Sequence, residues 1–190
     1  GINHLALVTT DMDATVRFYV GVLGARLVAT IGTDSFRHYF FEIGPANTVA
    51  FFEYRHLQST PFAKPAGVPD ARATQFDHLS LDLVDEAALE ELRGRLKSAE
   101  CEVTHVVDHG FIRSIYFNDP NGIALEASYW TLDPTGHAEL SLDDDRLFAD
   151  PTPVPAVTEL RREGRLDHLV STRLVHGFTD APDDWIVSPR

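Results

Sequence analysis

The chain has 190 residues, of which 44% are hydrophobic, and its net charge at neutral pH is −13. That apolar share is enough for a packed core, so general disorder is excluded. The negative charge and the lack of any cluster rich in lysine and arginine argue against binding to nucleic acid or to anionic membrane surfaces. No apolar run approaches the ~20 residues that a membrane-spanning helix needs.

A single cysteine, Cys101, is present, so an intrachain disulfide is excluded. Such cysteine usage is typical of a reducing compartment, and we expect a cytoplasmic protein. The sequence starts at Gly1 and not at a methionine, which leaves open a targeting segment further upstream.

The sequence contains an internal repeat, in which residues 3–28 resemble residues 77–103 and several matching residues are 74 positions apart. The aligned pairs include His4 with His78, Leu5 with Leu79, Leu7 with Leu81 and Asp11 with Asp85. Each copy opens on a short run of alternating apolar residues, which predicts a strand. The aspartate follows where a helix would begin, and aspartate is a favoured residue at helix N-caps.

In chain order, each copy then predicts one helix and three more strands. Apolar residues at helical spacing follow Asp11 and Asp85, and Gly24 is expected to end the first helix. The predicted strands cover residues 25–31, 36–43 and 48–54 in the first copy, and 102–108, 112–118 and 122–128 in the second. Turn sequences separate them, among them DPNG at 119–122. The sequence therefore predicts an α+β fold of two tandem βαβββ units.

The domain boundaries follow from this pattern. We expect one domain over residues 1–130, made of units 1–55 and 76–130 with a proline-containing linker at 56–75. The pattern stops after that domain. Residues 131–190 predict a C-terminal extension of loops and short helices that packs on the core or on a partner subunit.

Each unit carries a histidine on its first strand and a glutamate on its last. His4 precedes Glu53 by 49 residues, and His78 precedes Glu126 by 48. Imidazole and carboxylate together are the ligand set of zinc, iron, nickel or manganese. A glutamate between apolar residues is costly to bury unless a cation or hydrogen-bond donors satisfy it. The repeat thus predicts a metal site, although a lone histidine is more often structural and Glu53 could face outward beside Arg55.

The tandem units and these four residues resemble the vicinal oxygen chelate superfamily, which includes glyoxalase I, extradiol ring-cleaving dioxygenases, fosfomycin-resistance enzymes, methylmalonyl-CoA epimerase and bleomycin-resistance proteins. The resemblance covers about residues 2–128, where FYVGVLGARLV and DPNGIALE look like recurrent segments of the superfamily. It implies a curved, open mixed sheet around one divalent metal ion. The metal would act as a Lewis acid that chelates two neighbouring oxygens of a small substrate.

Two ligand sets remain open within this resemblance. Glyoxalase-type members hold the metal with four ligands, two per unit, which implies His4, Glu53, His78 and Glu126. In such an isomerase one of the glutamates would move a proton between carbons. Extradiol dioxygenases bind Fe(II) with two histidines and one glutamate, which implies His4, His78 and Glu126 with open coordination positions.

The segment VDHGFIRSIYFNDPNGIALE, residues 107–126, resembles the ring-cleavage dioxygenase signature. The signature has a histidine, then an aliphatic residue and a tyrosine, then Asp-Pro-x-Gly and finally the ligand glutamate. The resemblance implies that His109 and Tyr116 are catalytic and orient the substrate hydroxyls and the oxygen. The alternative is that His109 is a turn residue beside Gly110 and that Tyr116 is an ordinary strand tyrosine.

We therefore expect a metal-dependent enzyme, with an Fe(II) extradiol-type dioxygenase as the first hypothesis and zinc, nickel, manganese or cobalt as alternative metals. A glyoxalase-type isomerase, lyase or epimerase is the second hypothesis, and a drug-binding protein of the bleomycin-resistance type without catalysis is the third. The expected partner is a small molecule with vicinal oxygens, and an aromatic one would suit the phenylalanines around residues 40–54. His38 could line the same cavity. Whether the chain forms a homodimer stays open.

Overall fold

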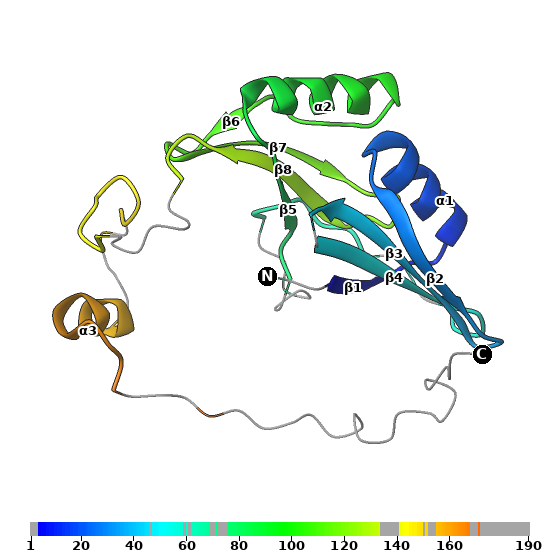
Figure 1. Cartoon of the computed structure of the whole chain (residues 1–190), viewed down its shortest axis with the longest axis horizontal. Coiled ribbons are helices and arrows are strands. Elements are labelled where there is room, and N and C mark those ends of the chain that lie inside the picture. Colours follow the sequence, from blue (N-terminus) through cyan, green and yellow to red (C-terminus); the bar gives the residue numbers. More distant parts are fainter. Residues whose placement is uncertain are drawn as a thin grey trace. The chain divides into compact units, whose positions relative to one another are not determined.

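The structure of the chain is a computed structural model, and it describes residues 4–45, 47–58, 60, 62–68, 71, 76–133, 141–149, 151, 155–167 and 171. The chain separates into two compact units, Gly1–Asp133 and Pro134–Arg190. Both sequence repeats lie in the first unit (Figure 1). The described part of the second unit contains one helix, α3 (Pro155–Glu163). No helix in the described ranges is long and apolar enough to cross a membrane.

The first repeat starts with a strand and a capped helix, as the sequence predicts. Its elements are β1 (His4–Val8), α1 (Met12–Val16), the π-helical continuation η1 (Arg17–Val22), β2 (Arg26–Gly32), β3 (Phe36–Gly44) and β4 (Asn47–Tyr54). Asp11 caps α1, because its carboxylate accepts the N–H of Ala14 at 2.9 Å. Gly24 follows the helix with a φ of +77°, a conformation that favours glycine. The strands form a sheet in the order β1-β4-β3-β2.

The second repeat has the same organisation. Its elements are β5 (Leu79–Asp82), α2 (Glu86–Ser98), β6 (Val107–Asp108), β7 (Ile112–Asn118) and β8 (Ala124–Trp130), in the sheet order β5-β8-β7-β6. Asp85 caps α2 through the N–H of Ala88 at 2.9 Å. In both sheets the first strand runs parallel to the last, and the other strand pairs are antiparallel. The predicted α+β fold of two tandem βαβββ units is confirmed.

One predicted strand is mostly absent from the structure. The sequence predicts a strand over residues 102–108, whereas β6 covers only Val107–Asp108, with an isolated bridge between Val103 and Phe117. The reason lies in Thr104, whose side-chain oxygen accepts the N–H of Tyr116 at 3.0 Å. A side chain thus occupies the place of a backbone carbonyl, and the regular ladder is interrupted there.

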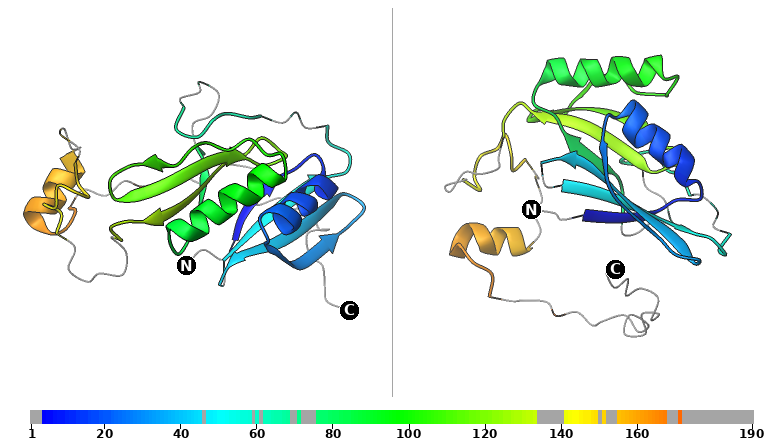
Figure 2. Two further views of the ribbon diagram at one scale, coloured as in Figure 1. Left: turned by 90° about the horizontal axis from the view of Figure 1, so that it is seen from above. Right: turned by 45° about the vertical axis from the view of Figure 1, so that its right-hand side comes forward.

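The helix of the first repeat, α1 with η1, and the helix of the second repeat, α2, cover the same side of the two sheets (Figure 2). On α2, Leu89, Leu92 and Leu96 are buried and share one face of the helix because they recur at three- and four-residue spacing. In the first repeat, Tyr19 packs against Phe41 and Phe51, with ring centroids 5.4 and 5.0 Å away. These residues belong to one hydrophobic core that both repeats share. Among the described residues of the first unit, no helix lies on the other side of the sheets.

The DPNG turn joins the second repeat to the first. The carboxylate of Asp119 accepts the backbone N–H groups of Asn121 and Ile123, both at 2.8 Å. This shapes the turn so that Asn121 reaches the β1–α1 connection. Its side-chain oxygen accepts from the Thr9 hydroxyl at 2.5 Å, and its amide donates to Thr15 at 3.1 Å. All of these side chains except that of Ile123 are buried, so the bonds form without competition from water.

Gly122 completes this turn for two reasons. Its φ is +78°, which side chains rarely tolerate. A Cβ atom at this position would also lie 2.6 Å from the Cβ of Ala63 in the linker. The turn therefore contacts the linker at Ala63 and also makes the contact between the two repeats.

We expect Asn121→Ala to lower the free energy of unfolding by about 2–3 kcal/mol, because two buried hydroxyls each lose one hydrogen bond. Asn118→Ala is the matched control. It removes one exposed hydrogen bond to the carbonyl of Gly122, and we expect it to cost less than about 1 kcal/mol. Urea unfolding followed by circular dichroism measures both. Equal losses for the two variants would contradict the role given to Asn121.

Candidate functional site

The side chains on the helix-free face of the second sheet are mostly polar. Successive residues of a strand point to opposite faces, so Leu125 and Ile115 face α2 while Glu126 and Tyr116 face the other way. Glu126 is directly paired with Tyr116 on β7 and with Ser80 on β5. Strand register alone therefore brings these groups together around one carboxylate.

A continuous run of contacts links four of the predicted site residues. The Tyr116 hydroxyl donates to Glu126 Oε1 at 3.0 Å, and Glu126 Oε2 lies 2.9 Å from His78 Nε2. His109 Nε2 lies 2.8 Å from the Tyr116 oxygen. A tyrosine has a single O–H, which here is donated to Glu126, so the contact with His109 uses the ring N–H of the histidine as donor.

Glu126 is held as a carboxylate although only 7% of the residue is exposed. Burial alone raises its pKa, but the hydroxyls of Ser114, Tyr116 and Ser80 and the charge of His78 together outweigh burial, and the pKa is lowered. The pKa of Tyr116 is raised, mainly by burial and then by its hydrogen bond to Glu126. The phenol therefore keeps its proton near neutral pH and remains a hydrogen-bond donor.

His78 also has a carboxylate on its other side. Its Nδ1 lies 2.7 Å from Oδ1 of Asp77, the preceding residue. The pKa of Asp77 is held well below its usual range by the Lys64 ammonium, the backbone N–H of Gly67 and His78, in that order. Asp77 is not among the residues predicted from the sequence, because neighbouring residues of a regular strand point to opposite faces and the sequence predicts His78 on such a strand. Both residues lie just before β5, where that alternation does not hold.

The structure does not bring Glu53 to this face. Glu53 Oε1 accepts the N–H of Met12 at 3.1 Å, and its other oxygen forms an ion pair with Arg37, the residue opposite it on β3. Met12 is the first residue of α1, so Glu53 lies on the helix side of the first sheet. Its partner is Arg37 and not the neighbouring Arg55 that the sequence suggests.

Strand register explains why the repeat misplaced Glu53. Leu5 pairs with Val49, 44 residues further on, whereas Leu79 pairs with Leu125, 46 residues further on. The offset of 74 that aligns the first strands therefore does not hold for the last ones. In register, the residue of the first repeat that corresponds to Glu126 is Ala50.

His4 lies on the helix-free face of the first sheet among aromatic rings. Its ring centroid is 5.4 Å from that of Phe40 and 6.3 Å from that of His38. His38 in turn stacks on Phe52 at 3.6 Å. The pKa of His38 is lowered, first by burial and then by the charge of His4, so His38 is neutral. The two repeats thus offer different surfaces, aromatic on the first sheet and polar on the second.

The donor set fits part of a metal site. His78 Nε2 and Glu126 Oε2 are an imidazole nitrogen and a carboxylate oxygen 2.9 Å apart, which suits a shared divalent cation such as iron or zinc. Within the described ranges, no three histidine, cysteine, aspartate or glutamate side chains are gathered so as to hold a metal ion. The pair is therefore the part of the predicted ligand set that the structure brings together.

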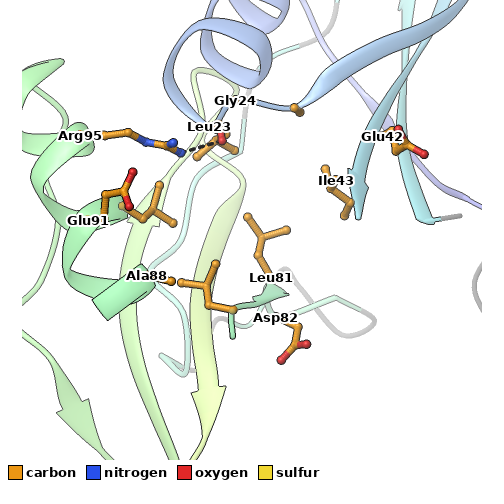
Figure 3. A pocket seen from close by; sticks show the side chains of 12 residues that line it. Leu23, Gly24, Glu42, Ile43, Leu81, Asp82, Ala88, Glu91 and Arg95 are labelled. Carbon is orange, nitrogen blue, oxygen red and sulfur yellow. Dashed lines mark hydrogen bonds between the residues drawn. The ribbon is translucent and has the colours of Figure 1, made fainter. Parts of the chain in front are cut away.

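One cavity borders this region, and another lies elsewhere in the first unit. The first, of about 420 Å³, lies beside Tyr116 and Thr104, with Pro65 and Ala66 of the linker among its walls. The other, of about 250 Å³, lies between the repeats, where Arg95 of α2 donates to the carbonyl of Leu23 at 2.8 Å (Figure 3). None of the predicted metal or catalytic residues lines the second cavity, whereas Tyr116 lines the first.

The lowered pKa of Glu126 predicts a stability that depends on pH. A carboxyl group with a lower pKa in the folded state stabilises the fold above its unfolded pKa, about 4.3 for glutamate, and loses this effect as the pH falls through the folded pKa. We therefore expect the difference in unfolding free energy between wild type and Glu126→Gln to be largest above about pH 5. The difference should shrink as the pH falls toward 3. Urea unfolding across this range measures the difference.

The control for this series is Glu91→Gln, which removes the same charge from an exposed position on α2. Its effect on the unfolding free energy should vary little with pH. A difference between wild type and Glu126→Gln that stays constant, or grows as the pH falls, would contradict the stabilisation assigned to the Glu126 carboxylate.

Comparisons with known proteins agree with this fold. The model of the Glyoxalase/Bleomycin resistance protein/Dioxygenase superfamily matches residues 1–127. The virulence protein STM3117 of Salmonella typhimurium (strain LT2) is 26% identical over 129 residues, which cover 68% of this chain and 83% of that protein.

Solved structures show the same likeness. A glyoxylase/bleomycin resistance protein/dioxygenase domain from Frankia sp. EAN1pec has a TM-score of 0.59 at 23% identity, covering 68% of this chain and 97% of the other. A lactoylglutathione lyase from Agrobacterium tumefaciens has a TM-score of 0.50 at 23% identity, covering 68% and 92%. At such identities the structures show the fold alone. With the family model matching two thirds of its length, the chain belongs to the Glyoxalase/Bleomycin resistance protein/Dioxygenase superfamily.

Proposed function

We propose that the chain is a metal-dependent enzyme for a small substrate with two neighbouring oxygens, and that its reaction is extradiol-type ring cleavage with Fe(II). The observation that carries this proposal is the run of contacts from His109 through Tyr116 and Glu126 to His78. It connects both residues proposed as catalytic to two residues proposed as ligands. A plain hairpin has no need of a buried glutamate at the centre of such a run, because burying a carboxylate is costly.

His4, His78 and Glu126 are the proposed ligands, and Glu53 is left out. A four-ligand set of the glyoxalase type would require Glu53 to leave both Arg37 and the N-terminal N–H of α1, and to reach the opposite face of its strand. The placement of Glu53 thus favours the three-ligand set. When bound, Fe(II) would supply Lewis-acid activation of the substrate oxygens and the electrons needed for reaction with dioxygen.

The chain's own residues would handle protons and developing charge. Because His109 donates from Nε2 to Tyr116, its Nδ1 is the acceptor nitrogen of a neutral ring. His109 is exposed and would take the proton of a substrate hydroxyl as general base. Tyr116 keeps its phenolic proton and would donate a hydrogen bond to negative charge that develops on the substrate. Because the phenol has one O–H, which Glu126 accepts in this structure, that hydrogen bond would pass from Glu126 to the substrate when Glu126 binds the metal.

The aromatic face of the first sheet supports a small-molecule partner with a planar, apolar part. Phe40, Phe52 and His38 lie there in mutual ring contact. Apolar walls with few polar groups are typical of pockets for small ligands. The same face would serve a protein that binds a drug without turning it over, so the tests below distinguish the two.

Metal content is the first test. We expect wild type, loaded with Fe(II) without oxygen and then dialysed, to keep about one iron per chain by mass spectrometry. Glu126→Gln should lose most of it, because a neutral amide is a poor ligand for a hard cation. Glu53→Gln should retain it, because Glu53 contacts Arg37 and α1. Loss of iron in Glu53→Gln together with retention in Glu126→Gln would refute the ligand set.

Activity is the second test. We expect the iron form to consume dioxygen with catechols and to form a yellow product. Tyr116→Phe should lower kcat by about 10²-fold at unchanged iron content, since one hydrogen-bond donor to developing charge is lost. Tyr129→Phe is the control, because its hydroxyl contacts Arg113 on the helix side of the sheet. Isomerase activity without oxygen uptake would contradict ring cleavage, and tight binding of an aromatic ligand without metal would contradict both enzymes.

A further inference from the structure

We propose that Asp77 is a positioning residue that keeps the ring proton of His78 on Nδ1 and so leaves the lone pair of Nε2 toward Glu126, and that Lys64 and Gly67 of the linker hold Asp77 in place for this. The inference rests on the proposed function for the role of His78 as a ligand. It adds a residue outside the predicted site, and it gives the linker a task in forming the site.

Both carboxylate oxygens of Asp77 are engaged. Oδ1 accepts the backbone N–H of Gly67 at 2.7 Å and lies 2.7 Å from Nδ1 of His78. Oδ2 accepts from the ammonium group of Lys64 at 2.5 Å. With donors on both oxygens, rotation of the carboxylate would break at least one charge-assisted contact. The orientation of Asp77 toward the imidazole is therefore fixed from the linker side.

Lys64 is unusual for a linker lysine, because only 9% of its side chain is exposed. A buried ammonium is costly unless its donors are used. Besides Asp77, the ammonium of Lys64 reaches the carbonyls of Pro65 at 3.2 Å and Val68 at 3.5 Å. These contacts close the linker turn on itself and tie it to the residue before His78. The linker is thus bound to the second repeat through Lys64 and Asp77, in addition to connecting the two repeats along the chain.

The consequence appears on the other side of the imidazole. His78 lies between two carboxylates, with Nδ1 2.7 Å from Asp77 and Nε2 2.9 Å from Glu126. When Asp77 accepts the Nδ1–H, the lone pair of Nε2 points at the Glu126 carboxylate. Two electron-rich atoms at this distance repel each other unless a proton or a cation lies between them. Asp77 therefore prepares Nε2 and Glu126 to share a cation, as outer hydrogen bonds do for many ligand histidines.

Two substitutions of Asp77 separate positioning from simple stabilisation. Asp77→Ala removes every acceptor oxygen. Asp77→Asn keeps one acceptor oxygen for Gly67 and His78 but places an amide N–H₂ against the Lys64 ammonium, so the Lys64 contact is lost while the contacts with Gly67 and His78 survive. Asp82→Asn is the matched control, because it removes an equal charge from the exposed end of β5.

The first readout is the ¹⁵N spectrum of the His78 ring in metal-free protein, at a pH high enough that the ring carries one proton. The His78 signals are identified by their absence in His78→Gln. We expect wild type and Asp77→Asn to carry that proton on Nδ1, and Asp77→Ala to show a mixture shifted toward Nε2. An unchanged tautomer in a folded Asp77→Ala overturns the inference.

The second readout is Co²⁺ binding, followed by visible absorption. We expect Asp77→Ala to bind Co²⁺ about 10- to 100-fold more weakly than wild type, the usual effect of losing an outer hydrogen bond to a ligand histidine. Asp77→Asn should recover most of the affinity, and Asp82→Asn should match wild type. Equal weakening by Asp77→Ala and Asp77→Asn overturns the positioning role. A wild type that binds no Co²⁺ overturns the proposed function, while the tautomer still decides this inference.

Discussion

The buried carboxylate of Glu126 is the constraint on which the site depends. A carboxylate that is 7% exposed has to be surrounded by donors or a cation, and the second repeat supplies hydroxyl groups from two strands, β5 and β7, and His78 from the segment before β5. Strand register places both Ser80 and Tyr116 opposite Glu126, and the Tyr116 hydroxyl donates to it. His78 and His109 extend the same set of contacts at either end. The polar face of the second sheet is thus built around one residue.

The first repeat shares the topology but not the chemistry of the second. Its closing strand has Ala50 where Glu126 would be in register, and its open face carries the rings of His4, His38, Phe40 and Phe52. Its own strand glutamate, Glu53, stabilises the start of α1 together with Arg37. Duplication therefore explains the fold of both halves, while the functional groups are divided unequally between them. The buried contacts of Asn121 with Thr9 and Thr15 hold the two unlike halves together.

Local signals predicted most of the fold. The N-cap aspartates Asp11 and Asp85 and the alternating strands gave elements that agree with the structure to within two residues, apart from the segment around Thr104. That segment differs because a side-chain hydrogen bond replaced a backbone one, which no alternation pattern reports. The contact of His78 with Glu126 was also predictable, since both residues belong to one repeat with a regular register. The face on which Glu53 lies was not predictable. Because VAFFEY has apolar residues at both odd and even positions, the sequence does not show which set of side chains faces the core.

The central claim is that His78 and Glu126 hold the metal on the polar face of the second sheet, without Glu53. A crystal structure of the Fe(II)-loaded protein, grown without oxygen and with the iron located by its anomalous signal, tests this most directly. The account predicts iron bound by His4, His78 Nε2 and Glu126, with Glu53 still paired to Arg37. Iron bound by Glu53, or iron away from His78, would contradict it.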